Sequence, residues 1–196
     1  VYWLWGSDRA APADMALVAD GVQLPVQAAG LRSHSWWATA LLGVVDFAVL
    51  ASMAYAHVHL AMLLDVCPPP GAALPTPGHG AANALLLLAG SGLLAWSARA
   101  PLREGARSQW ALRLRVGLAL ACACGAFAMA WRGHALAGLS PQADGWSASV
   151  AALLAYQGFH LVVLGVLAAY LVARPWSGLR GPRARATLDN VALFWH

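Results

Sequence analysis

The sequence has few charged residues, which make up 10% of its 196 residues, whereas hydrophobic residues make up 60%. It has no lysine, so all twelve basic residues are arginines. A typical soluble domain carries about 25% charged residues, and the mean hydropathy of +0.61 is typical of membrane proteins. The net charge of +4 is concentrated in short loops between apolar runs, which argues against binding to nucleic acid.

Cysteine is also scarce, and the familiar catalytic motifs are missing. The three cysteines form no CxxC pair and have no metal-ligand spacing. Cys122 and Cys124 lie in a predicted helix, where they point roughly 200° apart, so we interpret both as small core residues. No GxSxG, HExxH, Walker-type or cytochrome attachment motif occurs. We therefore predict no catalytic residue and no metal site in this chain.

Long apolar runs predict the fold class, because a helix of roughly 20 residues crosses about 30 Å of hydrocarbon. We expect an all-α, polytopic transmembrane helix bundle with four complete helices and the start of a fifth in LDNVALFWH. The complete helices are expected near 36–62, 82–98, 110–131 and 146–173. Residues 1–35 are interpreted as an N-terminal extension outside the bilayer, and residues 36–196 as the transmembrane domain. The proline-rich segment 65–80 is expected to lack regular structure.

The arginines predict the orientation of the bundle. In an up-and-down count of the helices, eleven of the twelve fall on the side of the N-terminal end, and only Arg132 falls on the other. The eleven are Arg9, Arg32, Arg99, Arg103, Arg107, Arg113, Arg115, Arg174, Arg180, Arg183 and Arg185. Because positive charge is retained on the cytoplasmic side, the N-terminal end is predicted to be cytoplasmic.

One acid, Asp46, interrupts the first apolar run. A carboxyl group at this depth is costly, so Asp46 is either a proton-binding or lipid-interacting group or a structural acid bonded inside the bundle. Asp46 lies about 15 Å into the first helix, and His160 lies about 21 Å into the fourth helix from the opposite side. We predict that both face the interior and form a direct or one-water hydrogen bond. The alternative is a bond from Asp46 to a hydroxyl or a lipid headgroup.

The remaining histidines are not expected to bind haem or metal. His57 shares the helical face of the acid, whereas His59 points to nearly the opposite side. His57 lies near the outer surface and His160 halfway across, so they are not at the same depth, and His134 is also not expected to be a ligand. Gln157 and His160 are one turn apart on one helical face, for which hydrogen bonding between helices is the preferred interpretation.

Two motifs in a fixed order point to a known family. Asp46 is followed thirteen residues later by His59, within VVDFAVLASMAYAHVHL, and a proline-rich loop comes next. The later segment YQGFHLVVLG carries Gln157 and His160. In this order the chain resembles subunit III of haem-copper respiratory oxidases, the cytochrome c oxidase subunit III family. That family has an S-E acid thirteen residues before a histidine, and G-F-H-G-x-H in a later helix.

The end of the chain adds a third motif. DNVALFWH is similar to the family's E-x-G-x-W-Y-W-H, with Asp189 seven residues before His196 and with Trp195 between them. The resemblance covers residues 36–196. Both family glutamates are aspartates here, and one histidine is a glutamine. A shorter acid still titrates, so the resemblance keeps a proton role in principle.

The resemblance implies an accessory, non-redox subunit of a terminal oxidase that reduces oxygen and pumps protons in a bacterial cytoplasmic membrane. Such a subunit would bind phospholipid, stabilise subunit I and support its proton uptake. Haem and copper would lie in partner subunits I and II, and cytochrome c or quinol would supply electrons to the complex. The aromatic start VYWLWG suits a subunit III fused behind subunit I, although a longer form trimmed inside a helix would begin in the same way.

The resemblance also implies a lipid-lined gap. The first two helices should lean away from the later ones, and Gly90, Ser91 and Gly92 should face another helix rather than the gap. Two other functions remain open. One is a small proton-coupled membrane transporter that uses Asp46 and His160, and the other is a subunit-III-like component of a nitric oxide reductase.

Overall fold

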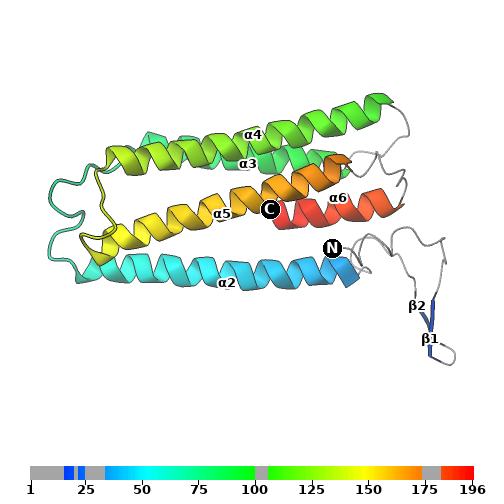
Figure 1. Ribbon diagram of the computed structural model, residues 1–196, viewed down its shortest axis with the longest axis horizontal. Helices are drawn as coiled ribbons and strands as arrows, with labels where there is room; N and C mark the ends of the chain where they lie inside the picture. The colour runs from blue at the N-terminus through cyan, green and yellow to red at the C-terminus, as the bar shows by residue number, and fades with distance from the viewer. Residues whose placement is uncertain (1–15, 20–21, 25–33, 100–105, 174–181) are drawn as a thin grey trace.

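The computed structural model describes residues 16–19, 22–24, 34–99, 106–173 and 182–196, and everything below refers to these residues. Figure 1 shows helices that lie lengthwise beside one another, preceded by a small strand pair. The elements are β1 (Ala16–Ala19), β2 (Val22–Leu24), α2 (His34–Leu63), α3 (Pro77–Arg99), α4 (Ala106–Leu136), α5 (Gly145–Ala173) and α6 (Pro182–Trp195). The strands pair antiparallel, a feature that the interpretation of 1–35 as an extension did not anticipate.

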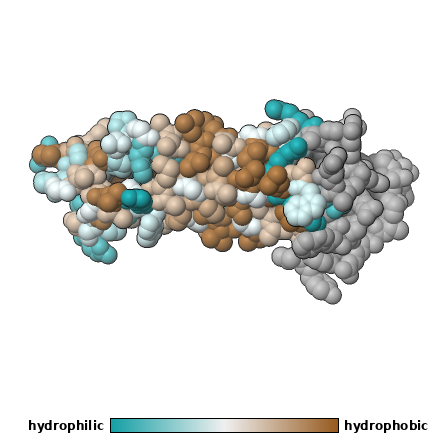
Figure 2. Space-filling model, turned by 90° about the horizontal axis from the view of Figure 1, so that it is seen from above, coloured by the Kyte–Doolittle hydropathy of each residue, from teal (hydrophilic) through white to brown (hydrophobic). Residues whose placement is uncertain are grey.

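The four predicted long helices are confirmed. Each of α2, α3, α4 and α5 is long and apolar enough to span a membrane, and α6 follows as a shorter helix. Figure 2 shows the resulting surface, in which brown hydrophobic residues cover the middle of the molecule and more polar residues lie toward its ends. This pattern is that of an integral membrane protein, whose apolar side chains face the lipid.

Each helix begins earlier than predicted, and α3 and α6 do so at a proline. The segment 65–80 was expected to lack regular structure, but α3 begins at Pro77. In the same way, α6 begins at Pro182, before the segment LDNVALFWH in which its start was expected. Proline is well suited to the first turn of a helix, because its missing N–H would have no partner there and its φ is already helical. These prolines therefore start helices rather than prevent them.

The packing of the helices differs from the predicted gap. The first two helices do not lean away together, because α3 packs most extensively on α4, whereas α2 packs on α5 and α6. Gly90 faces α4 as predicted: a Cβ at this position would lie 3.1 Å from the backbone oxygen of Ala119. Gly92 does not face a helix, since a Cβ there would meet nothing within 4 Å. Ser91 contacts His196, just beyond α6.

The apolar core lies among α3, α4, α5 and α6, toward the end of the bundle at which α2 begins (Figure 1). Its buried members are Leu94, Val116, Ala119, Ala168, Leu171, Leu188 and Val191. Helix α2 contributes no buried residue. It is joined to the other helices by polar side chains at three levels, and the central level is the candidate functional site.

Candidate functional site

Asp46 and His160 meet at mid-length of two neighbouring antiparallel helices. Asp46 lies about 18 Å from the start of α2, and His160 lies about 22 Å from the start of α5. His160 Nε2 is 2.9 Å from Asp46 Oδ1 and 2.8 Å from Asp46 Oδ2. The prediction of a direct hydrogen bond between these side chains is therefore confirmed. Depth predicted the contact because two polar groups at one level of adjacent apolar helices have few other partners.

Tyr156 is a third member of the site, and the sequence analysis missed it. Its hydroxyl donates to Asp46 Oδ1 at 2.5 Å and lies 3.1 Å from the backbone oxygen of Asp46. Tyr156 precedes His160 by four residues, so both lie on the face of α5 that meets α2. This i, i+4 spacing was the signal that could have identified it. The carboxylate thus accepts hydrogen bonds from two side chains of one helix.

Hydrogen-bond accounting shows how protons are distributed in this site. His160 Nδ1 is 2.9 Å from the backbone oxygen of Tyr156. A carbonyl oxygen only accepts, so Nδ1 carries a hydrogen. One further proton is then held between His160 Nε2 and the Asp46 carboxyl group. Whether this proton resides on nitrogen or on oxygen, the pair has no net charge, which is the least costly condition for an acid and a base within hydrocarbon.

The pair is only partly covered by other side chains of the bundle. The ring of Phe194 in α6 stacks on His160, with ring centroids 6.3 Å apart and an interplanar angle of 15°. The side chain of His160 is 21% exposed, and that of Asp46 is 34% exposed. In a bilayer, the exposed part of the acid would lie at hydrocarbon depth. The pair can therefore exchange its proton only through a contact at this face or a path between the helices.

Gln157 and His59 do not join the pair. Gln157 lies on the other side of His160 from Tyr156 around the helix, and it lines a cavity toward the start of α5. His59 is exposed, and its ring stacks on Tyr55 with centroids 6.1 Å apart. The predicted opposition of His57 and His59 is confirmed, because His57 faces α5, where its Nδ1 lies 2.8 Å from Ser149 Oγ.

The residues of the third motif lie on and just beyond α6. Asp189 is half-buried on α6. Trp195 packs against the apolar core, and His196 Nδ1 contacts the hydroxyl of Ser91 in α3. Asn190, next to Asp189, donates to Ser35 Oγ at 2.9 Å and so joins α6 to the start of α2. The motif therefore lies beside the Asp46–His160 pair through Phe194.

Metal-ligating side chains do not converge within the described residues, where no three of His, Cys, Asp or Glu form a group. Several ring nitrogens already have partners: His57 contacts Ser149, His160 contacts Asp46, and His79 Nε2 lies 2.8 Å from the backbone oxygen of Met129. These side chains link helices rather than form a ligand set. The chain matches no known family model, and no curated protein matches it either.

Proposed function

We propose that this chain is an accessory, non-redox subunit of a haem-copper terminal oxidase, in which the Asp46–His160 pair supports proton uptake. The observation that carries the proposal is the position of the pair. Acid and histidine come from the two motifs that resemble subunit III, they lie 114 residues apart in sequence, and they share a hydrogen bond. Phe194 from the third motif covers the histidine. Three separate motifs therefore contribute to one site.

The chemistry of the pair suits a proton-holding role. One proton lies between Asp46 and His160, and the hydroxyl of Tyr156 stabilises the carboxylate when that proton is on nitrogen. Release of the proton leaves one negative charge, and uptake of a second leaves one positive charge. Either state is costly in lipid, so the pair would buffer a proton for a neighbouring acceptor rather than remain charged.

The partners follow from what the chain offers. Four of its histidines (His57, His79, His160 and His196) contact other elements of the bundle, and haem and copper would be held by the partner subunits I and II. The exposed part of Asp46 would be covered by subunit I or by phospholipid. The arginine-rich end would face the cytoplasm of a bacterial cell, with electrons reaching the complex from cytochrome c or quinol.

The test is purification of the complex through a tag on this chain, from aerobically grown cells. The proposal predicts haem absorption bands, oxygen consumption and the loss of all haem when the chain is stripped from its partners. A tagged chain that is recovered without haem from active membranes would contradict the proposal. A complex that reduces nitric oxide instead of oxygen would establish the nitric oxide reductase alternative.

A proton-coupled transporter remains the second candidate, because a neutral acid–base pair at mid-depth is also what such a transporter needs. The two functions differ in the isolated chain. In liposomes that contain only this protein, an accessory subunit would move no solute when a pH gradient is applied. Solute uptake that depends on the gradient and is lost in Asp46→Asn would favour the transporter.

A further inference from the structure

Arg115 of α4 stacks on Trp96 of α3 at the surface of the bundle. Its guanidinium carbon lies 4.1 Å from the centre of the indole ring. Helices α3 and α4 lie side by side (Figure 1), and Arg115 comes four residues before Ala119, the residue that meets Gly90 of α3. Because Trp96 is 59% exposed and Arg115 is half-buried, the stack lies at the outer edge of the contact between the two helices.

The stack lies near the boundary between the hydrocarbon and the lipid headgroups. Trp96 comes just under one turn before the end of α3 at Arg99, and Arg115 lies about 7.5 Å further along α4 than Trp110. Both tryptophans are largely exposed, as expected of side chains at a membrane interface. An arginine at this depth keeps its apolar stem in the lipid while its charged group reaches the headgroups.

The guanidinium group of Arg115 has hydrogen-bond donors without acceptors. It carries five N–H donors around the edge of a plane, and stacking one face of that plane on a ring leaves the edge open. Among the residues that the structure describes, no hydrogen bond or ion pair involves Arg115. Arg99 differs, because it lies in the last turn of α3, where the helix carbonyl groups favour a positive charge. Arg115 therefore needs an acceptor from outside these residues, and at this depth the lipid supplies one.

The charge of this end of the bundle selects an anionic lipid. Among the described side chains, three arginines lie toward this end but only one acid, Asp189. A zwitterionic headgroup would bring a second positive charge close to these arginines, whereas an anionic headgroup would not. We propose that Arg115, oriented by Trp96, binds the phosphate of an anionic phospholipid of the phosphatidylglycerol type. This surface is separate from the Asp46–His160 pair, so the inference does not rest on the proposed function.

The experiment measures how tightly the purified chain binds its first lipid. The chain in detergent is titrated with phosphatidylglycerol or with phosphatidylcholine of the same acyl chains, and native mass spectrometry resolves each bound state. Phosphatidylglycerol should bind about fivefold more tightly, the effect of one arginine at the headgroup level. Glycerol phosphate, which has no acyl chains, should bind too weakly to be detected. Equal affinity of the two lipids, or equally tight binding of glycerol phosphate, would overturn the proposal.

Two variants of the stack locate the lipid. Arg115→Gln should remove most of the preference for phosphatidylglycerol, and Trp96→Leu should reduce it about threefold, because the guanidinium group is then no longer held in one orientation. Arg132→Gln is the matched control, since it makes the same change at an exposed position near the other end of α4. Circular dichroism checks that each variant retains its helices. A preference that survives in folded Arg115→Gln, or that falls equally in Arg132→Gln, would refute the proposal.

Discussion

Tyr156 and His160 impose a definite protonation pattern on Asp46, because each contributes a hydrogen bond from the same face of α5. The backbone oxygen of Tyr156 requires a hydrogen on His160 Nδ1. The carboxylate receives the tyrosine hydroxyl and the remaining histidine nitrogen. Position 160 therefore requires a histidine. Neither an amide nor a carboxyl group there would make all three contacts of this ring, one with the backbone oxygen of Tyr156 and two with the carboxylate of Asp46.

The protonation of the two ring nitrogens of His160 can be measured by NMR of the chain with ¹⁵N-labelled histidine in lipid bilayers. We expect His160, assigned from its loss in His160→Gln, to have a protonated Nδ1 at neutral pH. Asp46→Asn should leave Nδ1 protonated and make Nε2 an unprotonated acceptor of the asparagine amide. Tyr156→Phe should preserve the His160 signals and lower the stability by about 1 kcal/mol, a typical side-chain hydrogen bond in a membrane. An unprotonated Nδ1 in the wild type would be inconsistent with the site as described.

Asp144 is the residue whose titration should affect stability outside the membrane-spanning segments. It caps α5, with Oδ1 accepting from the Ser147 N–H at 2.7 Å and Oδ2 accepting from the Ser147 hydroxyl at 2.7 Å. These bonds, first that from the Ser147 backbone, lower the pKa of Asp144 below its usual value of 3.8. The cap therefore stabilises the fold above the unfolded-state pKa, and this contribution is lost as the pH falls through the folded-state pKa.

The variant Asp144→Ala should accordingly unfold at a lower temperature than the wild type at pH 7, and the difference should shrink as the pH is lowered below 3.8. Thermal unfolding in detergent, followed by circular dichroism, measures the effect. Asp65→Ala is the control, since Asp65 is exposed in the segment before α3 at the same end of the bundle. A difference in unfolding temperature between Asp144→Ala and the wild type that grows toward acidic pH would contradict a lowered pKa of Asp144.

The sequence was sufficient to predict the contact of Asp46 with His160, because depth in an apolar helix follows directly from residue number. It was not sufficient to choose between Tyr156 and Gln157 as the neighbour. Both lie within one turn of His160, and the choice depends on which side of α5 faces α2. That orientation results from packing among several helices, which a single sequence does not specify.

At the level of whole helices, α2 is held in an unusual way. It buries no residue, and polar contacts link it to the bundle at its start through Ser35, in its middle through Asp46 and near its end through His57. Apolar burial does not favour association between helices in lipid. Polar contacts and close packing therefore determine which helices α2 packs against. The same composition that made α2 easy to predict as a helix gives no information on its neighbours.

We therefore expect His57→Leu to loosen α2 without affecting the remaining bundle. The loss should be about 1 kcal/mol, and Ser149→Ala should add little to it, because both variants break one hydrogen bond. Susceptibility to protease in the segment after α2 and unfolding in mixed micelles are the measurements. Ser52→Ala is the control, since Ser52 bonds only to a backbone oxygen of its own helix. If the losses of stability in the double variant were fully additive, His57 and Ser149 would not stabilise α2 through a shared hydrogen bond.

The contact of α3 with α4 provides a second matched comparison. A side chain at Gly90 would press on the backbone of Ala119, whereas one at Gly92 would meet open space. Gly90→Val should therefore separate the helices and destabilise the protein by about 1–3 kcal/mol, whereas Gly92→Val should change stability little. Unfolding of both variants in the same micelles is the measurement. Equal effects of the two substitutions would show that α3 meets α4 through another face.

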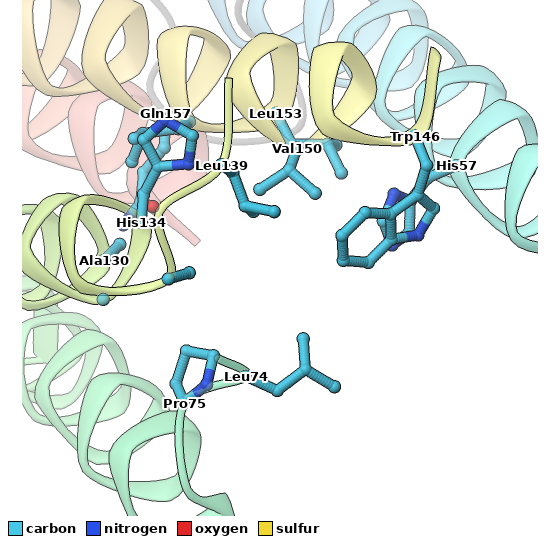
Figure 3. A pocket seen from close by; sticks show the side chains of 13 residues that line it. His57, Leu74, Pro75, Ala130, His134, Leu139, Trp146, Val150, Leu153 and Gln157 are labelled. Carbon is cyan, nitrogen blue, oxygen red and sulfur yellow. The ribbon is translucent and has the colours of Figure 1, made fainter. Parts of the chain in front are cut away.

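At the scale of the whole molecule, the number of long helices could be predicted from the lengths of the apolar runs, whereas their exact limits and their arrangement could not. The resemblance suggested that the first two helices form a separate pair, but Gly90 brings α3 to α4 and Asp46 brings α2 to α5. The cavity lined by His57 and Gln157 (Figure 3) could not be predicted from the sequence either, because its walls come from four parts of the chain.

Proton uptake by the proposed oxidase complex, once it is purified, tests the central claim most directly. The wild type, Asp46→Asn and the Ser52→Ala control are compared in complexes of equal haem content, with uptake followed by a pH-sensitive dye during a single oxygen pulse. If Asp46 and His160 hold a proton for the complex, Asp46→Asn will slow uptake severalfold at unchanged haem spectra, and Ser52→Ala will match the wild type. Identical uptake in all three complexes would contradict the account.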